Sequence, residues 1–130
     1  MKLWRKIKSF SLNLNYCYRN TVLTPIRAYG ILCHMGAKLV YWEKFVYSDA
    51  AVREMVLWQL PKATSDRPHG FKYRLYYGLS NGICIVRYDN ETGKGDHRHF
   101  RGQEGPYHFS DVETLITDFL TDIEEVRRKS

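Results

Sequence analysis

Histidine, aspartate, lysine and arginine side chains are concentrated in one stretch of this 130-residue chain, from Arg87 to His99. The stretch reads RYDNETGKGDHRH and directly follows an apolar segment, so we expect it to be a loop at the end of a strand. His97 and His99 titrate near neutral pH and can serve as the base and the acid of a proton-transfer reaction. Their spacing of two residues places both on one face if the segment is extended. Such a pair can cleave RNA without a metal ion when cations stabilise the phosphate.

Charged neighbours supply the remaining requirements of such a site. Asp96 or Asp89 can orient an imidazole, and Arg98 can bind a phosphate with two parallel hydrogen bonds. Other cations alternate with tyrosines on a predicted strand, where they would extend a basic, aromatic surface for stacking bases. The candidate catalytic residues are His97, His99, Asp96 and Asp89. The candidate substrate-binding residues are Lys72, Arg74, Lys94 and Arg98.

The polar stretch also allows interpretations other than a proton-transfer site. Residues 89–91 are common turn formers at a strand end. The glycines on either side of Lys94 indicate positive φ or a close backbone approach, but their spacing is not that of an ATP-binding loop. His97 and His99 could bind zinc or manganese, yet no third ligand follows at a suitable spacing. We therefore predict no metal site and no cofactor, and leave a metal hydrolase as an alternative.

A change in composition at Met35 divides the chain. Residues 1–34 contain six basic and no acidic side chains, whereas residues 35–130 hold 14 of each. The net charge of +6 therefore belongs to the N-terminal quarter, and it says nothing about the rest of the chain. We predict a single domain over residues 35–130. The basic extension before it is either an over-extended translation start, a basic arm that can be disordered, or a targeting segment.

Cysteine usage and hydrophobicity bear on the compartment. The three cysteines are odd in number and show no metal-ligand spacing, which fits a reducing cytoplasm. No apolar run approaches membrane-spanning length. The sequence therefore predicts a cytoplasmic protein without membrane association. Cys84, Trp42 and Trp58 lie in predicted strands and are expected in the core.

Alternation at 37–47 and 71–77, an apolar run at 52–60 and the apolar segment 83–88 after Asn81-Gly82 predict four strands, and a short fifth is allowed at 107–109. Ser110 and Glu113 match a capping box, after which apolar residues recur at helical spacing to Val126. Short connections between strands indicate an antiparallel meander. We therefore predict an α+β fold, a four- to five-stranded antiparallel β-meander with one C-terminal amphipathic helix packed on one face.

Two histidines outside the stretch carry weaker signals. His69, between Pro68 and Gly70, is expected to be a loop residue that could face the same cleft as the polar stretch. His108 alternates between Tyr107 and Phe109 and is expected to be a half-buried packing residue.

Four motifs in order resemble the TumE-type toxins of prokaryotic toxin–antitoxin systems. They are FKYRL at 71–75, RYDNE at 87–91, GKGDHRH at 93–99 and PYxF at 106–109, and the resemblance covers about residues 35–126. It implies a toxin that acts on RNA or the translation machinery, with a helix-turn-helix antitoxin of the TumA type as its partner. A ribonuclease reaction follows from the side chains and not from the family. The alternative is a non-enzymatic module that binds nucleic acid or protein, and the oligomeric state is open.

Overall fold

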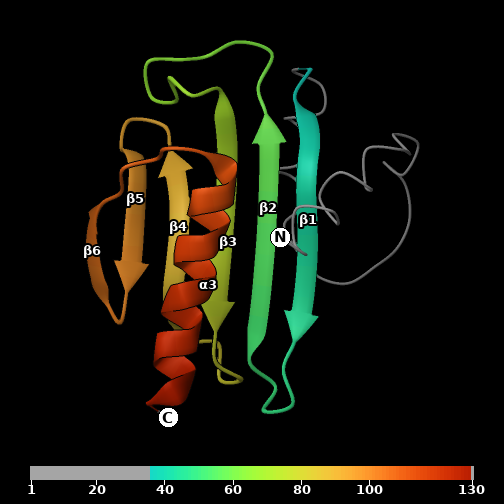
Figure 1. The fold of residues 1–130 in the computed structure, drawn as a ribbon, viewed down its shortest axis with the longest axis vertical. Helices are drawn as coiled ribbons and strands as arrows, with labels where there is room; N and C mark the ends of the chain where they lie inside the picture. Colours follow the sequence, from blue (N-terminus) through green and yellow to red (C-terminus); the bar gives the residue numbers. More distant parts are fainter. Residues whose placement is uncertain (1–35, 130) are drawn as a thin grey trace.

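The computed structural model describes residues 36–129, which form a six-stranded antiparallel sheet and one helix (Figure 1). The strands lie in the sheet in chain order. The elements are β1 (Lys38–Val46), β2 (Val52–Gln59), β3 (Phe71–Gly78), β4 (Cys84–Glu91), β5 (Gly95–Phe100), β6 (Gln103–Pro106) and α3 (Val112–Arg128). The α+β class and the antiparallel meander are confirmed, with more strands than predicted. The predictions about residues 1–34 lie outside the described residues.

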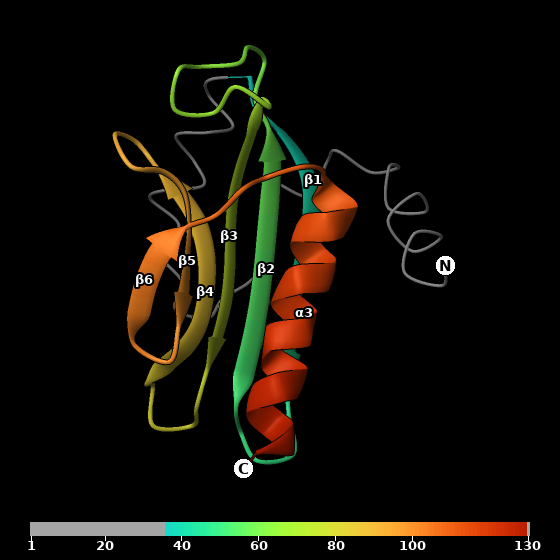
Figure 2. The same ribbon diagram turned by 60° about the vertical axis from the view of Figure 1, so that its left-hand side comes forward.

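The core lies between α3 and one face of the sheet (Figure 2). Along β3, Tyr73, Leu75 and Tyr77 are buried and alternate with more exposed neighbours, as expected of a strand covered on one side. The helix contributes an apolar stripe that includes Leu115 and Phe119, both fully buried. The prediction of an amphipathic helix packed on one face is therefore confirmed.

The helix begins one residue later than the capping box predicted. Asp111 is the N-cap, and its carboxylate accepts hydrogen bonds from the backbone N–H of Thr114 at 2.8 Å and from the Thr114 hydroxyl at 3.0 Å. The prediction that Ser110 caps the helix is thus wrong. Aspartate caps as well as serine, and its charge also interacts favourably with the positive end of the helix dipole.

The polar stretch is a β-hairpin and not a loop. β4 continues to Glu91, and β5 begins at Gly95, so only a short turn separates the two strands. Gly93 and Gly95 have φ values of 83° and 71°, which confirms the predicted positive φ. The expected strand at 107–109 is wrong, because β6 lies earlier, at Gln103–Pro106. Cross-strand pairing overrides the weak strand propensity of such polar segments.

Substitution of Gly95 by alanine should lower the free energy of unfolding by about 1–2 kcal/mol, because an L-residue is strained at positive φ. Open space surrounds the added Cβ, so the cost comes from the backbone alone. Gly105→Ala is the matched control, since Gly105 is equally unobstructed and lacks a positive φ. Urea denaturation of both variants measures the difference, and equal stabilities would contradict the argument.

The face of the sheet opposite α3 is termed the open face. A single helix covers one face, so side chains predicted as core can be exposed on the other. Trp42 is 58% exposed, and Cys84 and His108 are also exposed, so three burial predictions are wrong. Trp58 is buried as predicted. Within residues 36–129, no helix has both the length and the hydrophobicity needed to cross a bilayer.

Candidate functional site

The register of the β4–β5 hairpin divides the predicted site residues between the two faces. Tyr88 pairs with Arg98, and both lie on the helix face, where each contacts Asp122 of α3. The next pairs are Arg87 with His99 and Asp89 with His97. Because side chains alternate along a strand, the side chains of these two pairs project from the open face.

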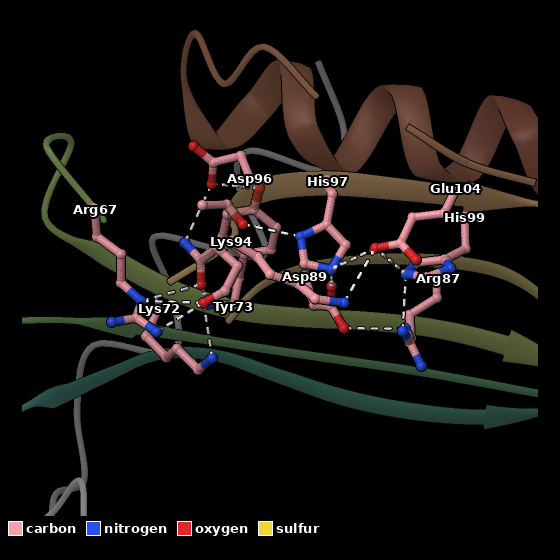
Figure 3. Close-up of polar contacts among 12 residues, drawn as sticks. Arg67, Lys72, Tyr73, Arg87, Asp89, Lys94, Asp96, His97, His99 and Glu104 are labelled. Carbon is pink, nitrogen blue, oxygen red and sulfur yellow. Dashed lines mark hydrogen bonds and ion pairs between the residues drawn. The ribbon is translucent and has the colours of Figure 1, made fainter. Parts of the chain in front are cut away.

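Five side chains meet on this face, and we call them the open-face centre: Arg87, Asp89, His97, His99 and Glu104 (Figure 3). His97 Nε2 lies 2.6 Å from Asp89 Oδ1. Glu104 Oε1, from β6, lies 3.6 Å from His97 Nε2 and 3.7 Å from His99 Nε2. Arg87 lies at the far end, with Nη2 2.8 Å from His99 Nε2 and Nε 3.0 Å from Asp89 Oδ2.

The backbone fixes the orientation of the His97 ring. Its Nδ1 lies 2.9 Å from the carbonyl oxygen of Gly95, which can only accept, so Nδ1 carries the proton. This leaves the other nitrogen, Nε2, beside the Asp89 carboxylate. His97 and Asp89 are each only 4% exposed. The pair is therefore a pre-oriented imidazole and carboxylate at the base of the centre.

His99 is held as a neutral imidazole. Arg87 has only donors, so His99 Nε2 accepts its hydrogen bond with a lone pair. Burial lowers the pKa of His99, and the positive charge of Arg87 lowers it further. This ring is therefore an unprotonated acceptor whose Nε2 lone pair is engaged by Arg87.

Arg98 serves the scaffold instead of the centre. Its guanidinium forms a bidentate pair with Asp122, with Nη2–Oδ1 and Nε–Oδ2 distances of 2.6 and 2.7 Å. The Tyr88 hydroxyl donates to the same carboxylate at 2.7 Å. Because the bidentate pair occupies Arg98 on the helix face, the structure does not bring this residue to His97.

Asp96 also lies on the helix face, where three partners saturate it. It accepts from the Tyr73 hydroxyl at 2.7 Å, from Asn90 Nδ2 at 3.2 Å and from His69 Nε2 at 3.1 Å. The other nitrogen of His69 accepts a backbone N–H at 3.1 Å, so Nε2 is the donor. Asp96 thus orients an imidazole, but that of His69 and not that of His97.

Three predicted cations lie around the centre. Lys72 donates to the carbonyl oxygen of Asn90 at 2.9 Å, and burial lowers its pKa, with a further decrease from Arg67. Arg74 pairs with Asp89 across the β3–β4 register and is exposed, so it projects from the open face beside the centre. Lys94 Nζ, in the hairpin turn, lies 3.5 Å from Glu104.

Comparison with known proteins decides the family. The family model described as Toxin TumE matches residues 34–127, which is most of the chain. The chain belongs to the TumE toxin family. No curated protein and no solved structure matches it. TumE membership makes the protein a toxin of a toxin–antitoxin system, which has an antitoxin as its partner.

Two residues of the open-face centre were not predicted as site residues from the sequence. Arg87 was part of the recognised motif without an assigned role, and Glu104 lies on a strand that was not predicted. A shallow pocket of about 270 Å³ lies beside them and is lined by Lys94, Asp96, His97, Glu104, Gly105 and Pro106. The available signal for Arg87 was its spacing of two from Asp89, whereas Glu104 has no charged residue at that spacing and is found only once the strand pairing is known.

Proposed function

We propose that this TumE-family toxin acts on RNA as a ribonuclease at the open-face centre, and that its antitoxin is a helix-turn-helix protein. The observation that supports the proposal is the convergence of His97, His99 and Asp89 on a sheet face that α3 does not cover. Burial and fixed hydrogen bonds orient these groups before a substrate arrives, which is what catalysis requires.

The surrounding cations suit a phosphodiester substrate. Arg74 projects from the open face beside Asp89, and Lys94 borders the pocket next to His97. The Arg74 guanidinium lies 5.9 Å from the centre of the Tyr76 ring, so charge and an aromatic surface occur together. RNA binding commonly combines phosphate contacts with base stacking on aromatic rings. Such a surface would hold a strand across the centre.

Phosphodiester cleavage needs an activated nucleophile, a stabilised phosphorane-like charge and a protonated leaving oxygen. Arg87 and Lys94 are placed to stabilise the charge, as guanidinium and ammonium groups do in other phosphoryl-transfer sites. The imidazoles and carboxylates can take up protons or hold an ion that activates the nucleophile. The centre therefore offers each function within one cluster.

The first test is induction of the wild type and of the His99→Gln variant in the absence of antitoxin. We expect wild-type induction to stop growth and degrade RNA, and His99→Gln to reduce the RNA cleavage rate by at least about 100-fold, the usual contribution of a proton-transfer group. His108→Gln is the matched control, since His108 is exposed and lies outside the strands that carry the centre. Growth arrest without any RNA turnover would favour the binding-module alternative.

The second test addresses the basic surface. Arg74→Gln should weaken RNA binding across all sequences and reduce the slope of log K against log salt by about 1, because one phosphate contact is lost. Fluorescence anisotropy with a labelled single-stranded RNA, measured at several salt concentrations, gives both quantities. An unchanged slope would show that RNA does not cross the Arg74 side of the centre.

A further inference from the structure

The open-face centre contains the donor set of a transition-metal site. One ligand atom from each of Asp89, His97 and His99 lies within 4.8 Å of the others. Glu104 Oε1 adds a fourth donor, 3.6 Å and 3.7 Å from the two imidazole nitrogens. Two imidazoles with carboxylates are ligands that zinc, manganese and iron share, whereas magnesium and calcium prefer oxygen alone.

Two of these atoms are buried without a hydrogen bond. Asp89 Oδ1 and His97 Nε2 have no hydrogen-bond partner among the described residues, and each side chain is only 6% exposed. They lie 2.6 Å apart, but the proton of an N–H there would not be directed at the oxygen. Native proteins rarely leave buried polar atoms unsatisfied, because each costs about 1–3 kcal/mol. A ligand shared by both atoms would satisfy them.

We propose that the open-face centre binds one divalent first-row transition-metal ion, of the zinc or manganese type, through His97 Nε2, His99 Nε2 and Asp89, with Glu104 as the fourth ligand. The proposal deepens the proposed function, because it concerns the same residues and rests on that function for its catalytic meaning. It replaces the metal-independent histidine pair that the sequence suggested. The missing third ligand is supplied by the hairpin register.

Side-chain rotations would bring the donor atoms of Asp89, His97 and His99, which lie within 4.8 Å of one another, to ligating distance. Metal–ligand distances of about 2.0–2.1 Å place neighbouring donors of a tetrahedral ion about 3.4 Å apart. The two distances from Glu104 already match this spacing, and the contact between His97 and Asp89 would lengthen by less than about 1 Å. The bond from His97 Nδ1 to the Gly95 carbonyl is the outer contact that usually orients a metal-binding imidazole.

Arg87 contacts the His99 nitrogen that such an ion would bind, so the two would compete. Its guanidinium contacts the lone pair of His99 and lies beside the Asp89 carboxylate (Figure 3). Ion binding would displace this contact and leave the guanidinium free for the phosphate of the substrate. An ion at this place would polarise the phosphoryl oxygen or activate the nucleophile. The same arginine thus opposes the ion in the free protein and assists it with substrate.

Calorimetric titration of the full-length toxin with Zn²⁺, Mn²⁺ and Mg²⁺ tests the site. We expect one equivalent of Zn²⁺ or Mn²⁺ to bind, with Mg²⁺ much weaker. His99→Gln and Glu104→Gln should weaken binding, His99→Gln by at least about 100-fold because it removes a ligand outright. Arg87→Gln should tighten binding by about tenfold, because a neighbouring positive charge no longer opposes the ion. His108→Gln serves as the control and should bind like the wild type.

Circular dichroism checks that each variant is folded, and Glu104→Gln decides the matter if His99→Gln unfolds. Absence of stoichiometric binding, or equal binding by His99→Gln and wild type, would overturn the site. Weaker binding by Arg87→Gln would overturn the competition argument. RNA cleavage that persists after complete chelation would refute the proposed metal site and leave the proposed ribonuclease function standing. Metal binding without RNA cleavage would refute the ribonuclease and leave the metal site standing.

Discussion

Replacement of Arg87 and of Arg98 by alanine should produce opposite defects, although both arginines belong to the same motif. Arg87→Ala should reduce RNA cleavage by about 100-fold or more, as does loss of a group that stabilises the transition-state charge. Its effect on the free energy of unfolding should be smaller than that of Arg98→Ala, since Arg87 reaches Asp89 through one nitrogen, whereas Arg98 holds Asp122 through two. Arg98→Ala should lower stability by about 3 kcal/mol, because Asp122 is left buried without its partner.

The value for Arg98 is at the lower end of the range for buried pairs because its side chain is 38% exposed, against 10% for Asp122. Guanidinium denaturation gives the stabilities, and cleavage rates per folded molecule give the activities. Arg98→Met is a useful second variant, because it keeps the packing of the side chain without its charge. Loss of specific activity in a fully folded Arg98→Ala protein would place Arg98 in the site after all.

Removal of the Asp96 carboxylate should lower the free energy of unfolding by at least as much as Arg98→Ala. Asp96→Ala leaves the donors of His69, Tyr73 and Asn90 without an acceptor. The expected loss is about 3–5 kcal/mol, as for other buried charges whose removal strands their partners. Asp96→Asn keeps one acceptor oxygen and should lose about half as much. The network links the loop before β3 to the β4–β5 hairpin, so both elements should loosen together.

Hydrogen exchange can locate this loosening. In Asp96→Ala, amide protection should fall in the loop around His69 and in the hairpin, and less in β1 and β2. Glu91→Ala is the matched control, because Glu91 is exposed and lies at the end of β4, the other strand of the same hairpin. If Asp96→Ala is as stable as that control, the network contributes little and Asp96 is free for another role.

Local patterns account for much of the fold. The apolar stripe of α3, the apolar run of β2 and the alternation in β3 appear within single segments, so all three were predictable. β5 and β6 were not, because their residues are polar and pair only through neighbours distant in sequence. The N-cap at Asp111 was missed by one residue, since two adjacent residues are both good caps.

The centre illustrates the same limit at the level of side chains. His97, His99 and Asp89 were predicted, and the hairpin brings them together. Asp96 and Arg98 alternate with the histidines, so interpreting the stretch as a strand would have placed them on the other face. Glu104 could not be found without the β5–β6 register, which pairs it with His99. Residue types indicated the kind of chemistry, and the pairing of the strands determined which residues belong to the open-face centre.

The chain order of the strands gives the toxin a fixed order of assembly during its synthesis. All strands of the meander leave the ribosome before α3, which follows β6 by roughly one to four seconds at ordinary translation rates. Until then Arg98 lacks Asp122, and the tyrosines and leucines of the sheet have nothing to cover them. A chain released early would therefore be an unstable substrate for proteases.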